Sequence, residues 1–125
     1  MERHIMIIAG FGFREDASAA SLRDAYDRLG GDADAIAVLD DKAGALCFKQ
    51  LAEKLGLPVF VVTMEEMQAV ETATQSAKVQ EKRGTGSVAE ACALAAAGSD
   101  GRLMAKRHIS EDRMATCALA QRSEK

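Results

Sequence analysis

The residues best suited to chemistry in this chain are Gly10, Gly12 and Arg14, which follow an apolar, strand-like run over residues 4–9. Two glycines spaced by one residue let a backbone turn tightly and leave its amides uncovered. The helix that we expect from Ser18 adds oriented N–H groups, and the guanidinium of Arg14 is a permanent cation. These features predict a corner that binds a carboxylate or a phosphate. The same residues equally fit a tight strand-to-helix turn with a solvated arginine, because a Gly-x-Gly pair alone has low specificity.

A second glycine-rich segment, Gly84-Thr85-Gly86-Ser87, precedes a later helix pattern. The backbone amides of a loop that runs into a helix can cradle an anion, and we favour that interpretation for its glycines. The alternative is a plain connection into a helix that begins at Ser87. For Glu90 we favour a structural role, in which it forms a capping box with Ser87.

Two lysines are candidates for contact with an acidic ligand. Lys42 follows two aspartates at the end of an apolar strand pattern. There it can bind a carboxylate, act as a base when desolvated, or pair with Asp41. Lys106 interrupts another apolar strand pattern and belongs to a local basic cluster made of Arg102, Lys106, Arg107, His108 and Arg113. Such a cluster fits a small acidic ligand, although a charge on an edge strand is usually solvated.

The composition excludes several classes of function. The 125 residues are 48% hydrophobic and 28% charged, and a formal net charge of −3 gives no general attraction to nucleic acid or to an anionic membrane. The two histidines and three cysteines have no spacing typical of metal ligands or disulfides, so we expect reduced thiols, no metal and no cofactor. Glu15 stands where a dinucleotide-binding turn needs a third glycine. No apolar run approaches the ~20 residues that span a bilayer, and we expect a cytoplasmic protein.

Hydrophobic periodicity predicts strands and helices in alternation. Short, continuously apolar runs are typical of buried parallel strands. The last two strand patterns, Arg102–Ile109 and Met114–Gln121, read as a hairpin. We therefore expect one domain over residues 1–125, with a three-layer α/β/α fold, a mostly parallel central sheet and a C-terminal antiparallel hairpin. In such sheets ligands bind beyond the carboxyl ends of the strands, where we expect both glycine-rich segments and Lys42 to converge.

Five short motifs occur in order along nearly the whole chain: Gly10-x-Gly12-x-Arg14 with Ser18; Ile36 to Lys42 with the helix up to Pro58; Gly84-x-x-Ser87-Val-Ala-Glu90; Leu103-Met-Ala-Lys106; and Thr116-Cys-Ala-Leu-Ala120. In this order and at these separations, they resemble the CobE family and the homologous C-terminal domain of CbiG, which belong to cobalamin (vitamin B12) biosynthesis. The candidate ligand-binding residues are those of the motifs: Gly10, Gly12, Arg14, Ser18, Lys42, Gly84, Thr85, Gly86, Ser87, Glu90 and Lys106.

The chain departs from the family pattern at three positions. Phe13 replaces a small or sulfur-bearing residue, Asp16 replaces a glycine, and Ala45 stands where an acid often follows the strand-end lysine. An acid gained at one position and lost at another weakens the case for any catalytic carboxylate. We therefore leave the catalytic residues unassigned and lean towards a protein without independent catalysis.

The resemblance implies a ligand with many carboxylates, a precorrin or another corrin intermediate. We expect a CobE-like protein that binds such a macrocycle and assists its conversion or its delivery to the larger enzymes of the pathway. One alternative is a CbiG-like hydrolase that opens the ring lactone of a precorrin and releases acetaldehyde. Another is a non-catalytic module that docks on a pathway enzyme through its C-terminal hairpin.

The segment from Thr72 to Thr85 has no helical periodicity and contains Lys78, Lys82 and Arg83. A polar connection of this length is usually a functional loop or a disordered one. We expect it to be mobile in the free protein and to close over the crevice when an anionic macrocycle binds. A plain tether between two helices is nearly as good an interpretation.

Overall fold

Five strands form one mixed sheet in the computed structural model, which describes residues 4–77, 87–98 and 101–124. The elements follow one another as β1 (His4–Phe13), α1 (Ala19–Asp27), β2 (Ala35–Leu39), the short 3₁₀ helix η1 (Asp40–Lys42), α2 (Leu46–Leu55), β3 (Val59–Val62), α3 (Met64–Ala77), α4 (Ser87–Ala97), β4 (Arg102–Ile109) and β5 (Ala115–Glu124). The strand order is β3-β2-β1-β5-β4.

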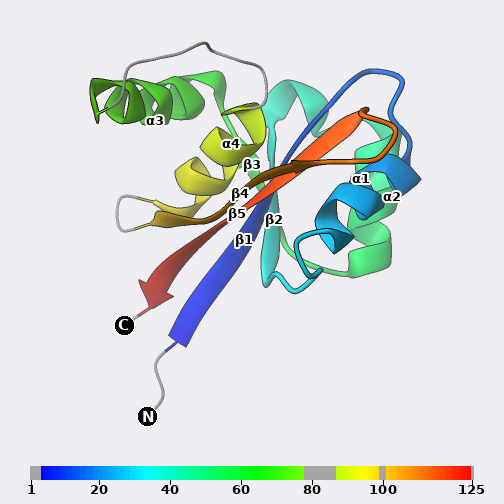
Figure 1. Cartoon of the computed structure of the whole chain (residues 1–125), viewed down its shortest axis with the longest axis horizontal. Helices are drawn as coiled ribbons and strands as arrows, with labels where there is room; N and C mark the ends of the chain where they lie inside the picture. The colour runs from blue at the N-terminus through cyan, green and yellow to red at the C-terminus, as the bar shows by residue number, and fades with distance from the viewer. Residues whose placement is uncertain (1–3, 78–86, 99–100, 125) are drawn as a thin grey trace.

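Four of these strands have their carboxyl ends on the same side of the sheet. β1, β2 and β3 are parallel, whereas β5 is antiparallel to both β1 and β4. β4 therefore runs in the direction of β1, and the carboxyl ends of β1 to β4 face one way. The chain termini lie at the opposite end of the sheet (Figure 1). The expected antiparallel hairpin, β4 with β5, is confirmed.

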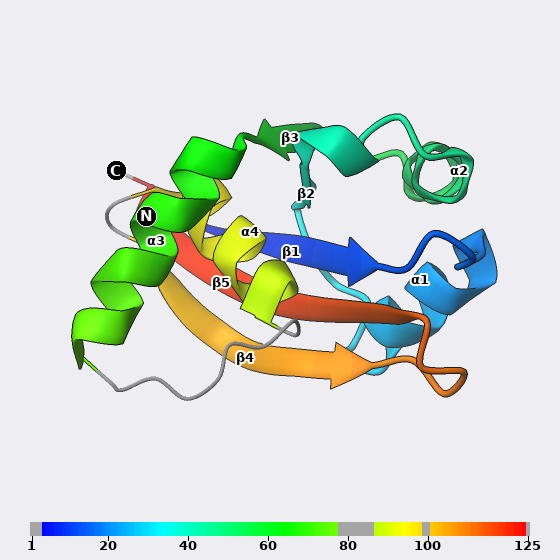
Figure 2. The ribbon, with the colours of Figure 1, turned by 90° about the horizontal axis from the view of Figure 1, so that it is seen from above.

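Helices cover both faces of the sheet (Figures 1 and 2). On one face α1 and α2 enclose a core that includes the buried rings of Phe11, Tyr26 and Phe48. On the other face α3 and α4 pack with smaller side chains, among them Cys92 and Ala93. This arrangement confirms the predicted three-layer α/β/α fold.

Two expected boundaries are wrong by four residues or more. β1 continues to Phe13 instead of ending at Ala9, because β5 pairs with it along its whole length. α3 continues to Ala77, so residues 72–77 are helical and not the start of a loop. The sequence from 64 to 77 contains no glycine or proline, and lost apolar periodicity alone does not end a helix. The rest of the proposed lid, residues 78–85, lies outside the described part of the chain.

The three cysteines form no disulfide: Cys92 and Cys117 are buried and Cys47 is half-buried. Burial raises the pKa of the Cys117 thiol, which keeps it protonated and unreactive. Within the described ranges, no three histidine, cysteine or acidic side chains gather as a metal site. None of the described helices combines the length and apolar character that crossing a membrane requires.

Candidate functional site

Cationic side chains from three of the sequence motifs lie on strands or just beyond their carboxyl ends. Arg14 directly follows β1, Lys42 ends the 3₁₀ helix that follows β2, and Lys106 lies on β4 beside Arg107. Arg14, Lys106 and Arg107 are exposed, and Lys42 is half-buried. We call these four residues the cationic rim.

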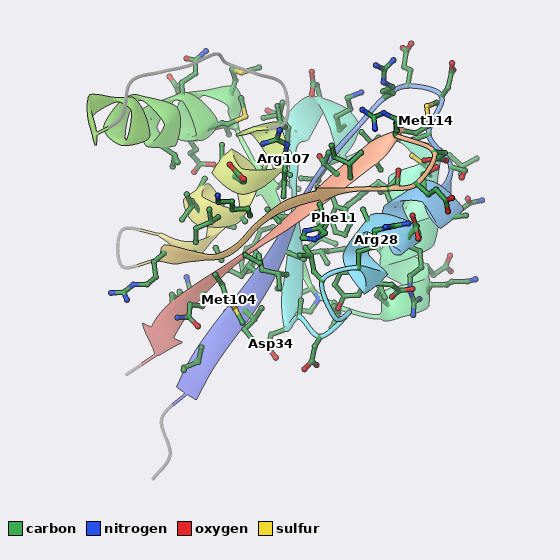
Figure 3. All side chains as sticks on the ribbon, in the orientation of Figure 1. Phe11, Arg28, Asp34, Met104, Arg107 and Met114 are labelled. Carbon is green, nitrogen blue, oxygen red and sulfur yellow. The ribbon has the colours of Figure 1, made fainter. Side chains whose placement is uncertain are left out.

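The four cations are not at one level along the strands. Lys106 and Arg107 lie between the register pairs Ala105–Leu119 and His108–Cys117, so both stand near Ala118 of β5. Ala118 pairs in turn with Gly10 of β1. This pair of cations therefore lies farther from the strand ends than Arg14, next to the first turn of α4 (Figure 3).

The glycines of the first motif do not form the expected tight turn, and that geometry is wrong, whereas a ligand contact by Gly10 or Gly12 stays a prediction. Gly10 and Gly12 lie inside β1, opposite Ala118 and Thr116 of β5. Their lack of a side chain serves packing. A Cβ atom on Gly10 would lie 2.3 Å from the carbonyl oxygen of Ala89 in α4, and one on Gly12 would lie 3.4 Å from the Cβ of Val88. Gly10 thus lets α4 rest directly on the strand, whereas at Gly12 the helix leaves room for an ordinary contact.

Ser18 is the N-cap of α1, as expected. Its hydroxyl accepts a hydrogen bond from the Ser21 amide at 3.2 Å. The Ser21 hydroxyl in turn accepts one from the Ser18 amide, which completes a capping box. The cap fixes where α1 begins after the Arg14 turn. A ligand contact by Ser18 stays a prediction.

Lys42 is held by an aromatic ring. Its ammonium lies 5.1 Å from the centre of the Phe13 ring, in the range of a cation–π contact. The Phe13 ring is in turn stacked on Phe48, with 6.3 Å between centroids and 6° between planes. No ion pair joins Lys42 to Asp41 within the described residues, so the ring and not the aspartate positions the lysine.

The turn of the C-terminal hairpin is tied to α1 and then supports Arg14. The Asp112 carboxylate accepts hydrogen bonds of 2.6 Å from both Ser21 and Ser110, whose side chains are buried. The Ser110 hydrogen bond, followed by that from Ser21, lowers the pKa of Asp112. Beyond this turn, the carbonyl oxygen of Met114 accepts a hydrogen bond from the Arg14 amide at 2.9 Å. Figure 3 shows Met114 at this end of the sheet.

Asp24 of α1 makes a second tie to the turn. Its carboxylate accepts a hydrogen bond from the Glu111 amide at 2.8 Å and pairs with Arg28 at 3.1 Å. The amide hydrogen bond is the main reason why the pKa of Asp24 is lowered, with the Arg28 contact second. Sequence reasoning missed both carboxylates; for Asp112 the signal was the Ser-x-Asp pattern at 110–112, which is typical of a turn that bonds its own backbone.

The second glycine-rich segment is described only in part. Gly84, Thr85 and Gly86 lie outside the described residues, so their anion-binding role stays a prediction. Ser87 is the first residue of α4. The Glu90 carboxylate reaches across to β4, where it accepts a hydrogen bond from the Arg107 amide at 3.0 Å. A capping role alone therefore does not account for Glu90.

A family model described as Cobalamin synthesis G C-terminus matches residues 7–120. The chain belongs to this family. No curated protein matches the chain by sequence.

Solved structures agree with the family assignment. The cobalamin biosynthesis protein chiG from Agrobacterium tumefaciens str. C58 is 36% identical, with a TM-score of 0.69 over 91% of this chain and 96% of that one. CobE, a protein from the cobalamin (vitamin B12) biosynthetic pathway, is 30% identical, with a TM-score of 0.74 over 97% and 94% of the two chains. A cobalamin biosynthesis protein G homologue from Sulfolobus solfataricus shares the fold at 21% identity and a TM-score of 0.65, over 94% of this chain and 37% of that longer one.

In this member of the Cobalamin synthesis G C-terminus family, the motifs divide into two kinds. Gly10, Gly12 and Ser18 shape the backbone, and Glu90 binds a neighbouring backbone amide. Arg14, Lys42 and Lys106 present positive charge near one edge of the sheet. Such an arrangement can bind and orient an anion with several carboxylates, because exposed cations gain affinity mainly by acting together.

Proposed function

We propose that this protein binds a polycarboxylate intermediate of corrin biosynthesis at the cationic rim, and assists its conversion or its delivery to a larger enzyme of the pathway. The observation that carries the proposal is that Arg14, Lys42 and Lys106, from three separate sequence motifs, are exposed or half-buried cations on or just beyond β1, β2 and β4, whose carboxyl ends face one way. A precorrin carries acidic side arms around a wide ring, so cations spread over several strands suit it better than a compact pocket does.

The charges of the rim lead us to expect binding that weakens with salt. A single exposed ion pair contributes about 0–1 kcal/mol, so useful affinity needs several contacts at once. Each contact is screened over a length of about 10 Å at 0.1 M salt. We therefore expect micromolar affinity at low salt and a marked loss between 50 and 500 mM sodium chloride.

A titration of the purified protein with hydrogenobyrinic acid, a polycarboxylate corrin, followed by absorbance, tests the proposal. We expect saturable binding, a loss of about tenfold or more in affinity for the double variant Arg14→Ala/Lys42→Ala, and no loss for Lys54→Ala. Lys54 is an exposed lysine in the last turn of α2 and serves as the matched control. Absence of saturation at high micromolar ligand, or equal affinity of the double variant and the wild type, would overturn the proposal.

The same preparation separates binding from catalysis. Incubation with a lactone-bearing precorrin and an assay for acetaldehyde distinguish a carrier from a hydrolase. We expect no turnover by this chain alone. Catalytic release of acetaldehyde would replace the proposal with the hydrolase function that the family resemblance also allows.

A further inference from the structure

The strand that carries Lys106 and Arg107 is irregular. β4 is an edge strand, and its register with β5 shifts twice, once between Leu103 and Ala105 and again between Ala105 and His108. At the second shift, two residues of β4 oppose one residue of β5, which is the pattern of a β-bulge. A bulge leaves backbone groups outside the ladder and re-aims the side chains that it contains.

Glu90 provides a hydrogen-bond acceptor for a backbone amide at this bulge. Its Oε2 atom accepts the hydrogen bond of the Arg107 amide at 3.0 Å, from the first turns of α4. The carboxylate thus binds the main chain of Arg107, while no carboxylate of the described residues pairs with the guanidinium of Arg107. The contact fixes the backbone of the bulge and leaves its two cations available to an anion.

The position of Glu90 depends on Gly10 of β1. A Cβ atom at Gly10 would lie 2.3 Å from the oxygen of Ala89 and 2.6 Å from the nitrogen of Ala93. Only a glycine permits α4 to rest on the strand backbone at that distance. Ala89 immediately precedes Glu90, so the close seating of α4 also sets how far the Glu90 side chain reaches towards β4.

We propose that Glu90 is a positioning residue, which holds the β4 bulge at Arg107 so that Lys106 and Arg107 are presented to the ligand. The inference rests on the proposed function, because it assigns a role at the same cationic rim. It links three motifs in one chain of contacts: Gly10 seats α4, Glu90 of α4 holds the bulge, and the bulge carries the cations. It also gives a conspicuous carboxylate a task other than acid–base catalysis.

Two variants of Glu90 distinguish this positioning role from a capping role and from acid–base catalysis. Glu90→Ala removes the acceptor, whereas Glu90→Gln keeps an acceptor oxygen and removes the charge. Glu53→Ala is the matched control, because Glu53 is an exposed acid of α2 and makes no hydrogen bond or ion pair within the described residues. Hydrogen exchange of the assigned Arg107 amide, measured by NMR without ligand, reports the contact, and affinity for hydrogenobyrinic acid reports its consequence. Dispersed spectra show that each variant is folded.

We expect Glu90→Ala to speed exchange of the Arg107 amide at least tenfold and to weaken corrin binding by about tenfold. Glu90→Gln is expected to keep protection and affinity close to those of the wild type, as is Glu53→Ala. Unchanged Arg107 exchange in Glu90→Ala would overturn the inference whatever the ligand does, and so would tighter corrin binding by both Glu90 variants. If the wild type binds no corrin, the proposed function fails, and the exchange measurement still decides whether Glu90 holds the bulge.

Discussion

The two faces of β1 are packed in opposite ways by the four consecutive residues Gly10-Phe-Gly-Phe13. Phe11 and Phe13 point to the α1 and α2 side, where their rings meet Phe48 at centroid distances of 6.1 and 6.3 Å. Gly10 and Gly12 face α4, whose backbone would lie within 2.3 Å of a Cβ at Gly10. One face is thus filled by large side chains, and the other is closed by direct contact between a helix and a strand.

Each face positions cations of the rim by its own means. On the aromatic face, the Phe13 ring supports the ammonium of Lys42. On the glycine face, the close approach of α4 lets Glu90 bind the backbone of Arg107. The comparison shows that the glycines and phenylalanines of this motif act on the cations through packing within the fold.

The largest expected effect is on the aromatic face. Phe48→Ala removes a ring that is 2% exposed and leaves a cavity beside Phe11 and Phe13, so we expect a loss of about 4 kcal/mol in the free energy of unfolding. Urea denaturation followed by circular dichroism measures it. Phe60→Ala on the other face, where Phe60 is half-buried, is the control with a smaller loss. A loss below about 1 kcal/mol in the free energy of unfolding for Phe48→Ala would show that packing of the aromatic rings does not stabilise this face.

The glycine face is probed by a matched pair of substitutions. Gly10→Ala forces a Cβ against backbone atoms that cannot swing aside, so we expect a loss of about 3 kcal/mol in unfolding free energy. Gly12→Ala meets a hydroxyl at 3.1 Å and a Cβ at 3.4 Å, and we expect about 1 kcal/mol or less. The same denaturation experiment compares them. Equal losses would contradict the view that Gly10 is the point of closest helix contact.

The hydrogen bonds that Asp24 and Asp112 form between α1 and the hairpin turn predict that stability depends on pH. The pKa values of Asp24 and Asp112 are both lowered by their hydrogen bonds in the folded protein. Their contribution is therefore present above the ordinary aspartate pKa of about 3.9 and is lost as the pH falls through the lowered folded values. We expect Asp112→Asn to flatten the acid side of the stability profile, measured as urea midpoints between pH 3 and pH 7. A profile equal to that of the wild type would show that the Asp112 carboxylate does not hold the turn. Asp41→Asn is the control, for which we expect no effect.

The smallest effect concerns the cation–π contact. Phe13→Leu keeps an apolar side chain at the end of β1 but removes the ring beneath Lys42. An exposed contact of this kind contributes about 0.5–1 kcal/mol. We therefore expect corrin affinity to fall about two- to fivefold, which corresponds to that energy. The titration used for the rim variants measures it. In the Lys42→Ala background, Phe13→Leu should have no further effect, and a full additional loss would contradict a role through Lys42.

The sequence predicted most of the fold because its signals are local. Apolar runs such as Ala35–Leu39 are buried over their whole length, and Gly56 and Gly98 adopt positive φ at helix ends. Two boundaries failed, for different reasons. α3 continues to Ala77 because residues 64–77 contain no helix breaker. β1 extends to Phe13 because β5, about a hundred residues later, pairs with it, and this pairing does not appear in any local pattern.

The sequence predicted the positions of the cations better than the packing of the glycines. Arg14, Lys42 and Lys106 are charged side chains at strand ends or on strands, and topology alone brings them to one region. The role of Gly10 depends on which helix crosses it, and the contact of Glu90 depends on a bulge in β4. Local sequence specifies neither, because each arises from packing between separate elements.

The most direct test of the account is a map of the amide shifts that a corrin causes. Titration of ¹⁵N-labelled protein with hydrogenobyrinic acid should shift the amides around Arg14, Lys42, Lys106 and Arg107, on both faces of the carboxyl edge. The amides of Ile5 and Arg122, at the opposite end of the sheet, should not move. Shifts confined to that opposite end, or to the outer edge of β3, would contradict binding at the cationic rim.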